Sequence, residues 1–262
     1  MISNRCQVIG KGGCPEQASA KICMRVLVIT GAGVSAESGI STFRGKDGYW
    51  RNLDPTKLAT PEAFARDPNL VWNWYCERRQ RIRKAQPNPA HQAIANLALQ
   101  ADEFLLVTQN VDDLHLRAGL PPEKMVQIHG DIFMTRCSRC EFRRYEHEQE
   151  QDGASLPKCP DCGALMRPGV VWFGEQLDLR KIGTVENFVT GGDCDLVIVA
   201  GTSALFGYII DWALRARGQA GQLIEVNPEE TSLSQFATRS FREPAGVALP
   251  RVVDELLSNG SA

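Results

Sequence analysis

Short apolar runs recur along the chain, and most are apolar at nearly every position instead of alternating with polar residues. A strand that is apolar on both faces is typical of a parallel sheet covered on both sides. The pattern therefore predicts a mainly parallel sheet. Its strands should lie within residues 25–30, 104–110, 125–130, 195–203 and 222–227.

Amphipathic stretches of helical period separate several of these runs. The clearest are 89–101 and 209–218, each with apolar residues three or four positions apart. Strand and helix in alternation predict an α/β fold, with a doubly wound, Rossmann-like parallel sheet.

Two segments interrupt this rhythm, and we interpret them as insertions that build a smaller module beside the sheet. One begins after the first strand and turn, contains a helical stretch and ends at the breaker Pro-Asn-Pro; the other carries paired cysteines and little periodicity. The predicted organisation is a flexible extension 1–24 and a domain 25–262. Within that domain we expect the core at 25–44, 89–130 and 176–262, the helical insertion at 45–88 and the cysteine module at 131–175.

Composition restricts the class of protein. Of 262 residues, 43% are hydrophobic and 23% charged, as in an ordinary soluble globular protein. A net charge of −2 provides no basis for binding nucleic acid or an anionic membrane, and no run is long enough to span a bilayer. The first 23 residues lack the features of a signal or transit peptide. Nine cysteines without such a signal favour a reducing compartment, so we expect a cytoplasmic protein without disulfides.

Four of the cysteines form two Cys-x2-Cys pairs separated by 18 residues. Each pair can place two thiolates on one tight turn, and two such turns complete a tetrahedral Zn²⁺ site. The polar spacer cannot fold alone, so zinc binding should contribute to folding. The predicted ligands of one structural zinc are Cys137, Cys140, Cys159 and Cys162.

The first predicted strand leads directly into Gly31-x-Gly33-x-x-Ala36, the pattern of a dinucleotide-binding turn. A dehydrogenase would add a second strand ending in a ribose-binding acid about twenty residues later. Residues 41–50 read Ser-Thr-Phe-Arg-Gly-Lys-Asp-Gly-Tyr-Trp instead. A dinucleotide is therefore expected, in a site not built for hydride transfer.

The stretch 71–83 places Val71, Tyr75, Arg78 and Ile82 on one helical stripe. An arginine on such a stripe can bury its stem and extend its charged end to water. Alternatively, the guanidinium faces inward to a ligand.

Several motifs occur together in the order found in the sirtuins, which are NAD-dependent protein-lysine deacylases. They are GAGVSAESGISTFRG (31–45), TQNVDDLH (108–115), IHG (128–130), the two cysteine pairs, RPGVVWFGE (167–175), GTS (201–203) and IEVN (224–227). The chain resembles this family over residues 25–253. Tyr75-x-x-Arg78 resembles the acyl-pocket motif of class III sirtuins.

The resemblance implies attack of the acyl-lysine oxygen on C1′ of the nicotinamide ribose, release of nicotinamide, and formation of O-acyl-ADP-ribose and free lysine. It makes His129 the general base, which suits an imidazole of ordinary pKa near 6.5; His91 and His115 keep structural roles. Gln109, Asn110 and Asp112 should surround the nicotinamide ribose. The other implied NAD-binding residues are Gly31, Ala32, Gly33, Ala36, Glu37, Thr42, Phe43, Arg44, Gly201, Thr202, Ser203, Asn227 and Ala245.

The resemblance also implies partners and substrates. Acylated-lysine proteins should bind along a strand at VVWFGE (170–175), with Val171 and Phe173 beside the lysine. Tyr75 and Arg78 favour succinyl and malonyl groups over acetyl, because a guanidinium can bind a carboxylate through two hydrogen bonds. The oligomeric state stays open and a monomer is compatible with the sequence.

One departure and three alternatives remain. After Gly-Thr-Ser the chain reads ALFGYII, with Tyr208 where the family has proline. A mono-ADP-ribosyltransferase would use the same NAD site with another acceptor. A Rossmann oxidoreductase is disfavoured by the missing ribose acid, and a zinc-ribbon nucleic-acid adaptor by the mixed charges of the cysteine spacer.

Overall fold

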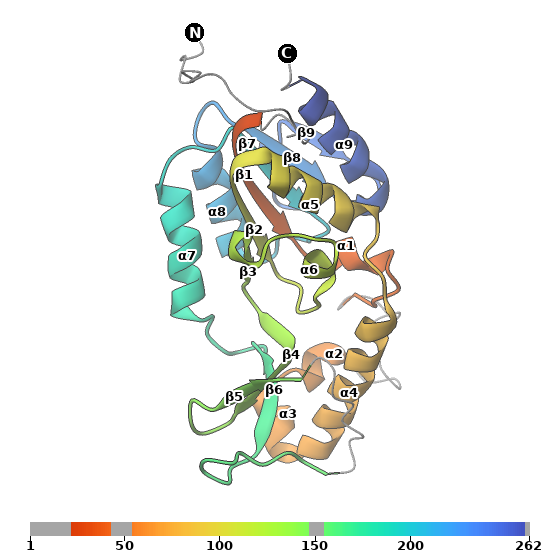
Figure 1. The fold of residues 1–262 in the computed structure, drawn as a ribbon, viewed down its shortest axis with the longest axis vertical. Coiled ribbons are helices and arrows are strands. Elements are labelled where there is room, and N and C mark those ends of the chain that lie inside the picture. The colour runs from red at the N-terminus through yellow and green to blue at the C-terminus, as the bar shows by residue number, and fades with distance from the viewer. Residues whose placement is uncertain (1–21, 43–53, 147–154, 260–262) are drawn as a thin grey trace, which may run out of the picture.

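The computed structural model describes residues 22–42, 54–146 and 155–259 (Figure 1). Phe43, Arg44 and most of the predicted extension 1–24 lie outside the described residues.

A six-stranded parallel sheet has the order β3-β2-β1-β7-β8-β9. All five predicted runs contribute a strand, and the sheet adds β9, a three-residue strand that no apolar run announced. The strands are β1 (Ile22–Thr30), β2 (Ala101–Thr108), β3 (Met125–Gln127), β7 (Leu196–Ala200), β8 (Gln222–Val226) and β9 (Arg239–Phe241).

Helices cover both faces of this sheet, which confirms the doubly wound prediction (Figure 1). Alternate residues of β1 enter opposite layers: Val26 and Val28 pack with one set of helices, Leu27 and Ile29 with the other. The first layer includes α5 (Pro89–Gln100) and α9 (Ala245–Asn259), and the second α7 (Leu179–Thr190) and α8 (Gly207–Arg217). The short helices α1 (Gly33–Ala36) and α6 (Leu114–Arg117) follow β1 and β2. The described residues also contain 3-10 turns at Pro122–Lys124 and Ser234–Phe236.

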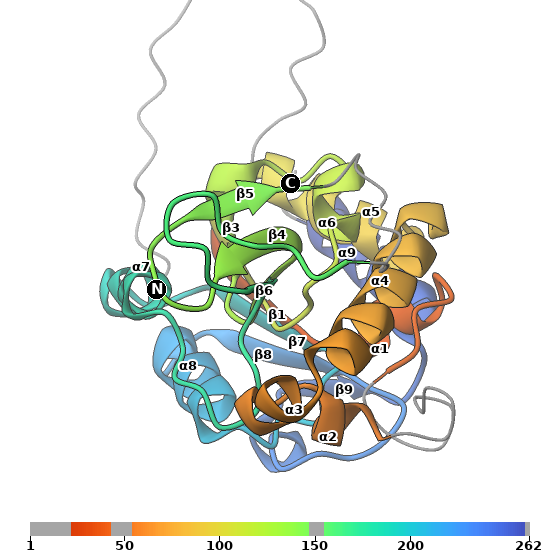
Figure 2. The ribbon, with the colours of Figure 1, turned by 90° about the horizontal axis from the view of Figure 1, so that it is seen from below.

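The two insertions pack together at one end of the molecule, onto which Figure 2 looks. Their apolar cluster joins Trp72 and Ile82 of the helical insertion to Phe133, Val170 and others of the cysteine segment. The elements are α2 (Pro55–Leu58), α3 (Pro61–Arg66), α4 (Pro68–Lys84) and an antiparallel sheet of order β5-β4-β6, with β4 (Gly130–Cys137), β5 (Arg143–Tyr145) and β6 (Met166–Val170).

Local sequence explains where three of the helices begin. Thr60, Asp67 and Asn88 each accept a hydrogen bond from the first turn of α3, α4 and α5, and each is followed by proline. Proline suits a first helical position because it has no N–H to satisfy there. The Pro-Asn-Pro breaker thus ends one insertion and starts the return to the core.

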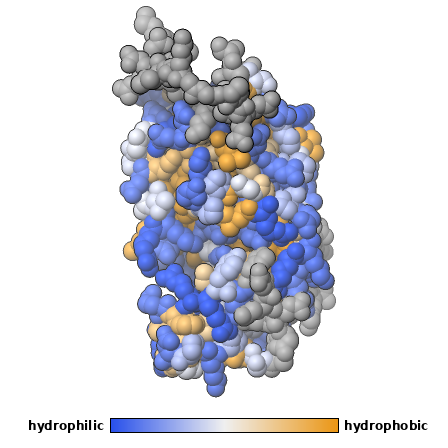
Figure 3. Space-filling model, in the orientation of Figure 1, coloured by the Kyte–Doolittle hydropathy of each residue, from blue (hydrophilic) through white to orange (hydrophobic). Residues whose placement is uncertain are grey.

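Hydrophilic side chains cover much of the face shown in Figure 3. Within the described ranges, no helix combines the length and the apolar composition needed to cross a bilayer.

Candidate functional site

The site lies where the chain switches from one half of the sheet to the other, between the carboxyl ends of β1 and β7. Ligands of doubly wound proteins bind at such a switch point. Gly31 and Gly33 follow β1 and approach Gly201 after β7, with the Gly33 N–H donating to the Gly201 carbonyl over 2.8 Å. A Cβ on Gly31 would lie 2.7 Å from the Thr202 Cβ, and a Cβ on Gly33 2.8 Å from the Gly201 Cα. Glycine is therefore required here for two turns of the protein to meet.

Polar side chains after β1, β2 and β7 form one network. The Ser35 hydroxyl donates to Asp112 over 2.9 Å and accepts from the Asn110 amide over 3.0 Å. The Gln109 amide donates to the Thr202 hydroxyl over 2.9 Å. Burial raises the pKa of Asp112, against hydrogen bonds from Leu114 and Ser35 that lower it. The structure thus brings together Gln109, Asn110, Asp112 and Thr202 as the motifs predict.

His129 stands between the two sheets, after β3 ends at Gln127 and before β4 begins at Gly130. Its Nδ1 lies 3.1 Å from the Gln109 carbonyl, and its Nε2 lies 2.7 Å from the Tyr208 hydroxyl. A carbonyl only accepts, so the network assigns the ring proton to Nδ1 and leaves a lone pair on Nε2. Burial lowers the pKa of His129, only partly offset by the Gln109 carbonyl. The imidazole is therefore neutral near pH 7.

A small cavity lies beside this network. Arg78 contributes to its wall and its Nε is buried, which favours the inward-facing alternative over the snorkelling one. Tyr75, one turn earlier on α4, is 3% exposed and its hydroxyl accepts from Trp172 Nε1 over 3.0 Å. Burial raises the pKa of Tyr75 to about 12. The cavity is lined by Ala32, Ser35, Ile40, Ser41, Arg78, Ile82, Asn110, Val111 and Asp112.

The segment 170–175 is not the strand we predicted. The strand β6 ends at Val170, because the next amides turn to different partners: Val171 N donates to the His129 carbonyl and Phe173 N to the Ala59 carbonyl. Gly174 then takes a φ of +85°. Val171 nevertheless lies against His129, and Phe173 is 42% exposed nearby in sequence.

The residues predicted to hold adenosine lie around the ends of β7 and β8. Asn227 directly follows β8, and its amide donates to the Glu229 carbonyl over 2.8 Å. Ala245 begins α9, where Glu37 accepts from the neighbouring Gly246 N–H over 2.6 Å. Ser203 lies in the loop after β7, Ala36 is the last residue of α1, and Thr42 is the last residue before the undescribed segment. No contact tests their roles, which stay predictions.

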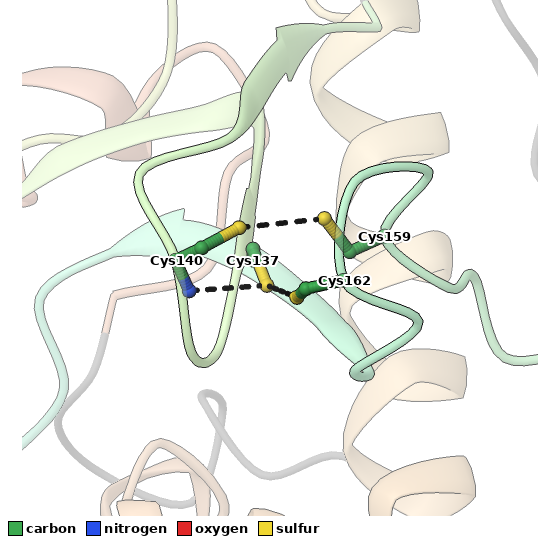
Figure 4. A group of neighbouring side chains, drawn as sticks. All are labelled: Cys137, Cys140, Cys159 and Cys162. Atoms are coloured by element: carbon green, nitrogen blue, oxygen red, sulfur yellow. Dashed lines mark hydrogen bonds between the residues drawn. The ribbon is translucent and has the colours of Figure 1, made fainter.

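The four predicted zinc ligands form one cluster (Figure 4). All four sulfurs lie within 4.8 Å of one another, with Cys137–Cys162 at 3.4 Å and Cys140–Cys159 at 3.5 Å. Tetrahedral Zn–S bonds of about 2.3 Å require sulfurs about 3.8 Å apart, so the cluster fits zinc. The backbone N–H groups of Arg139 and Cys140 point at the Cys137 sulfur. The sequence therefore predicted the four cysteines that the fold brings together.

Some functional neighbours were missed. Ser35 lies inside a quoted motif but only the fold shows it linking Asn110 to Asp112. Trp172 supports Tyr75, and Tyr208 bonds His129 from 79 residues away. The sequence signal for Tyr208 was its departure from the family pattern; no signal singled out the other two.

Comparisons with known proteins agree with this geometry. The model of the "Sir2 family" matches residues 31–206. An NAD-dependent protein deacylase of Aquifex aeolicus is 44% identical over 233 residues, covering 89% of this chain and 95% of that protein. A Sir2 homologue mutant bound to 2′-O-acetyl ADP ribose superposes with a TM-score of 0.84 at 43% identity, covering 91% of this chain and 94% of the other. A Sir2 homologue–NAD complex reaches 0.82 at 43% identity, covering 90% of each.

Proposed function

The chain belongs to the Sir2 family, and we propose that it removes acyl groups ending in a carboxylate, succinyl and malonyl, from protein lysines. It is an NAD-dependent protein deacylase; the preference for acidic acyl groups, with nicotinamide and O-acyl-ADP-ribose as products, is the proposal. Acetyl-lysine is the weaker substrate.

The position of Arg78 is the observation that carries the proposal. Its guanidinium shares a cavity with the apolar side chains of Ile40, Ile82 and Val111. A succinyl group has a short aliphatic chain and a terminal carboxylate, which match these apolar side chains and the cation. Ser35, Ser41, Asn110 and Asp112 form the polar part of the lining. Burial lowers the pKa of Arg78, while Tyr75 and Asp112 raise it, and arginine stays charged at neutral pH. A carboxylate would bind this charge through paired hydrogen bonds. An acetyl group has no terminal carboxylate and cannot form this pair.

One short segment connects this cavity to the base. Gln109 holds His129 through its carbonyl, while Asn110 and Asp112 line the cavity with Arg78. An acyl-lysine with its acyl end at Arg78 would therefore have its amide close to the residues that surround the base. We assign proton acceptance to the Nε2 lone pair of His129, which only the neutral imidazole has.

The residues at the switch point suit a dinucleotide. Uncharged donors and acceptors from Gln109, Asn110 and Thr202 meet where such cofactors bind. The Ser38 hydroxyl is buried and has no hydrogen-bond partner among the described residues, so a ligand could satisfy it. When bound, NAD supplies the ribose that receives the acyl group.

Exposed apolar side chains in the two segments that contact His129 suit a protein substrate. Phe173 is 42% exposed, Leu205 67% and Phe206 41%, and the Phe206 ring lies 5.7 Å from the His129 ring. Apolar groups that stay in water beside a site favour a macromolecular partner.

The test compares Arg78→Met with wild type on succinyl- and acetyl-lysine peptides of one sequence. Charged hydrogen bonds contribute about 1.5–3 kcal/mol, so kcat/KM for the succinyl peptide should fall about ten- to a hundredfold while acetyl activity survives. Arg81→Met is the matched control, because Arg81 is exposed on the same helix. Equal losses on both peptides would contradict the proposed acyl preference.

A second variant tests the chemistry itself. His129→Ala should lose product formation by about 10²–10⁴-fold, as expected for a removed base. Mass spectrometry of the products separates the alternative: ADP-ribose attached to a protein acceptor, without O-acyl-ADP-ribose, would identify a mono-ADP-ribosyltransferase instead.

A further inference from the structure

The contact between Tyr208 and His129 has no counterpart in the roles assigned so far. Tyr208 lies in the first turn of α8, and its hydroxyl is 2.7 Å from His129 Nε2. Because Nδ1–H is directed to the Gln109 carbonyl, Nε2 can only accept, and the tyrosine O–H must donate. Burial raises the pKa of Tyr208, so the hydroxyl keeps its proton. Tyr208 thus uses the one lone pair with which His129 could accept a proton.

Aromatic packing holds Tyr208 in this position. Its ring stacks on Phe206 at 5.5 Å with an interplanar angle of 14°, and it meets Trp212 at 5.0 Å. The edge of Phe206 also contacts His129. Ala204, two residues before Phe206, adopts a φ of 49°, which is rare for a residue with a side chain. The loop therefore keeps a strained backbone while it directs Tyr208 at the base.

The contact lies near the surface, where it can be broken. Phe206 is 41% exposed, and His129 and Tyr208 are each only partly buried. A hydroxyl on a ribose is chemically equivalent to the tyrosine hydroxyl as a donor to Nε2. The two cannot occupy the same lone pair, so they compete.

We propose that Tyr208 is a removable cap on His129: its hydroxyl occupies the Nε2 lone pair, and a cofactor ribose hydroxyl must displace it before His129 accepts a proton. The inference rests on the proposed role of His129 as the base. A net hydrogen bond between neutral groups corresponds to about a two- to tenfold population ratio. The cap should weaken apparent NAD binding by that factor.

Tyr208→Phe removes only the hydroxyl and keeps the ring packed on Phe206 and Trp212. The first measurement is independent of deacylation: diethyl pyrocarbonate carbethoxylates a free imidazole nitrogen, and peptide mapping reports the rate at each histidine. We expect His129 to react about two- to tenfold faster in the variant. His91 and His115, 0% and 2% exposed, serve as internal standards that should stay slow.

The second measurement is steady-state kinetics with NAD varied. Tyr208→Phe should lower KM for NAD by about the same two- to tenfold factor without lowering kcat. The matched control is Tyr145→Phe, which removes the hydroxyl of an exposed tyrosine in β5 and should change neither reading.

Two results would overturn the cap. An unchanged or slower carbethoxylation of His129 in Tyr208→Phe would show that the hydroxyl does not mask Nε2. A fall in kcat with KM unchanged would show that the hydroxyl takes part in proton transfer. If wild type formed no deacylation product at all, the proposed function would fail, while carbethoxylation would still decide whether Nε2 is masked.

Discussion

The large sheet and the small module are stabilised in different ways. In β1, Val26, Leu27, Val28 and Ile29 are all 0% exposed, with apolar helices on both faces. At the far end of the small module the buried apolar cluster consists of Cys137, Cys159 and Met166, with a few half-buried neighbours. The large sheet can fold on buried apolar area alone, whereas that end of the module depends on what its cysteines bind.

The site needs both regions. His129 lies between the end of β3 and the start of β4, so its position depends on the large sheet on one side and on the module on the other. Arg78 and Tyr75 come from α4, which packs against the module. A loss of structure confined to the module should therefore abolish catalysis while leaving the sheet folded.

Loss of the metal should produce the largest difference in stability between the module and the large sheet. Structural zinc contributes an apparent ~10–16 kcal/mol in small zinc modules. Wild type should contain about one zinc per chain, and Cys137→Ser should lose it. In this variant amide hydrogen exchange should increase across β4 and β6 but not across β1, β2 and β7. Metal analysis and exchange mass spectrometry measure both. Cys194→Ser is the control, because Cys194 is buried far outside the cluster; full zinc content in Cys137→Ser would contradict the prediction.

A substitution of Arg79 tests how much of the stability of the module comes from its contacts with α4 and not from zinc. This side chain is 1% exposed, and it donates to the Ile132 carbonyl over 2.6 Å, to Thr135 over 2.9 Å and to Glu146 over 3.2 Å. Breaking a buried pair costs about 3–5 kcal/mol. We expect the lower end for Arg79→Met, because Arg144 also binds Glu146.

Urea unfolding of Arg79→Met at neutral pH measures this loss. Arg81→Met, exposed on the same helix, should stay within about 0.5 kcal/mol of wild type. A loss no larger than that of the control would mean that α4 contributes little to the module.

The same comparison explains how much of the fold the sequence predicts. Strands of the large sheet are buried on both faces, so each is a continuous apolar run that can be recognised from local sequence. All three residues of β5 are exposed, and β9 reads Arg-Ser-Phe, so neither has an apolar pattern to detect. Their pairing is decided by neighbours distant in the chain.

The site divides along similar lines. The cysteine cluster and the group around Asn110 follow from spacing and motif order, because their chemistry requires those residues. The strand expected at 170–175 is absent since Val171 and Phe173 find separate backbone acceptors. The bond from Tyr208 to His129 depends on how α8 packs on the sheet, which no local pattern encodes.

The smallest expected effect is at His91, in the helix α5 that covers one face of the large sheet. This side chain is 0% exposed, pairs with Asn88 at the start of α5 and approaches the Ser35 hydroxyl at 3.3 Å. Burial lowers the pKa of His91 to about 4, against about 6.5 when unfolded. Between these two pKa values, His91 is protonated in the unfolded chain and neutral in the folded one. The contribution of His91 to stability is complete well above pH 6.5 and declines as pH falls toward 4, by at most about 1.4 kcal/mol per pH unit.

His91→Gln keeps a side chain that can hydrogen-bond but cannot titrate. The unfolding free energy should then fall by about 1 kcal/mol less between pH 6.5 and 5.5 than in wild type, while His115, whose pKa is lowered mainly by burial, still contributes. Zinc thiolates protonate in acid too, so a chromophoric chelator must show that metal is retained over this range. Equal slopes for the variant and wild type would assign acid sensitivity to the module and not to the sheet.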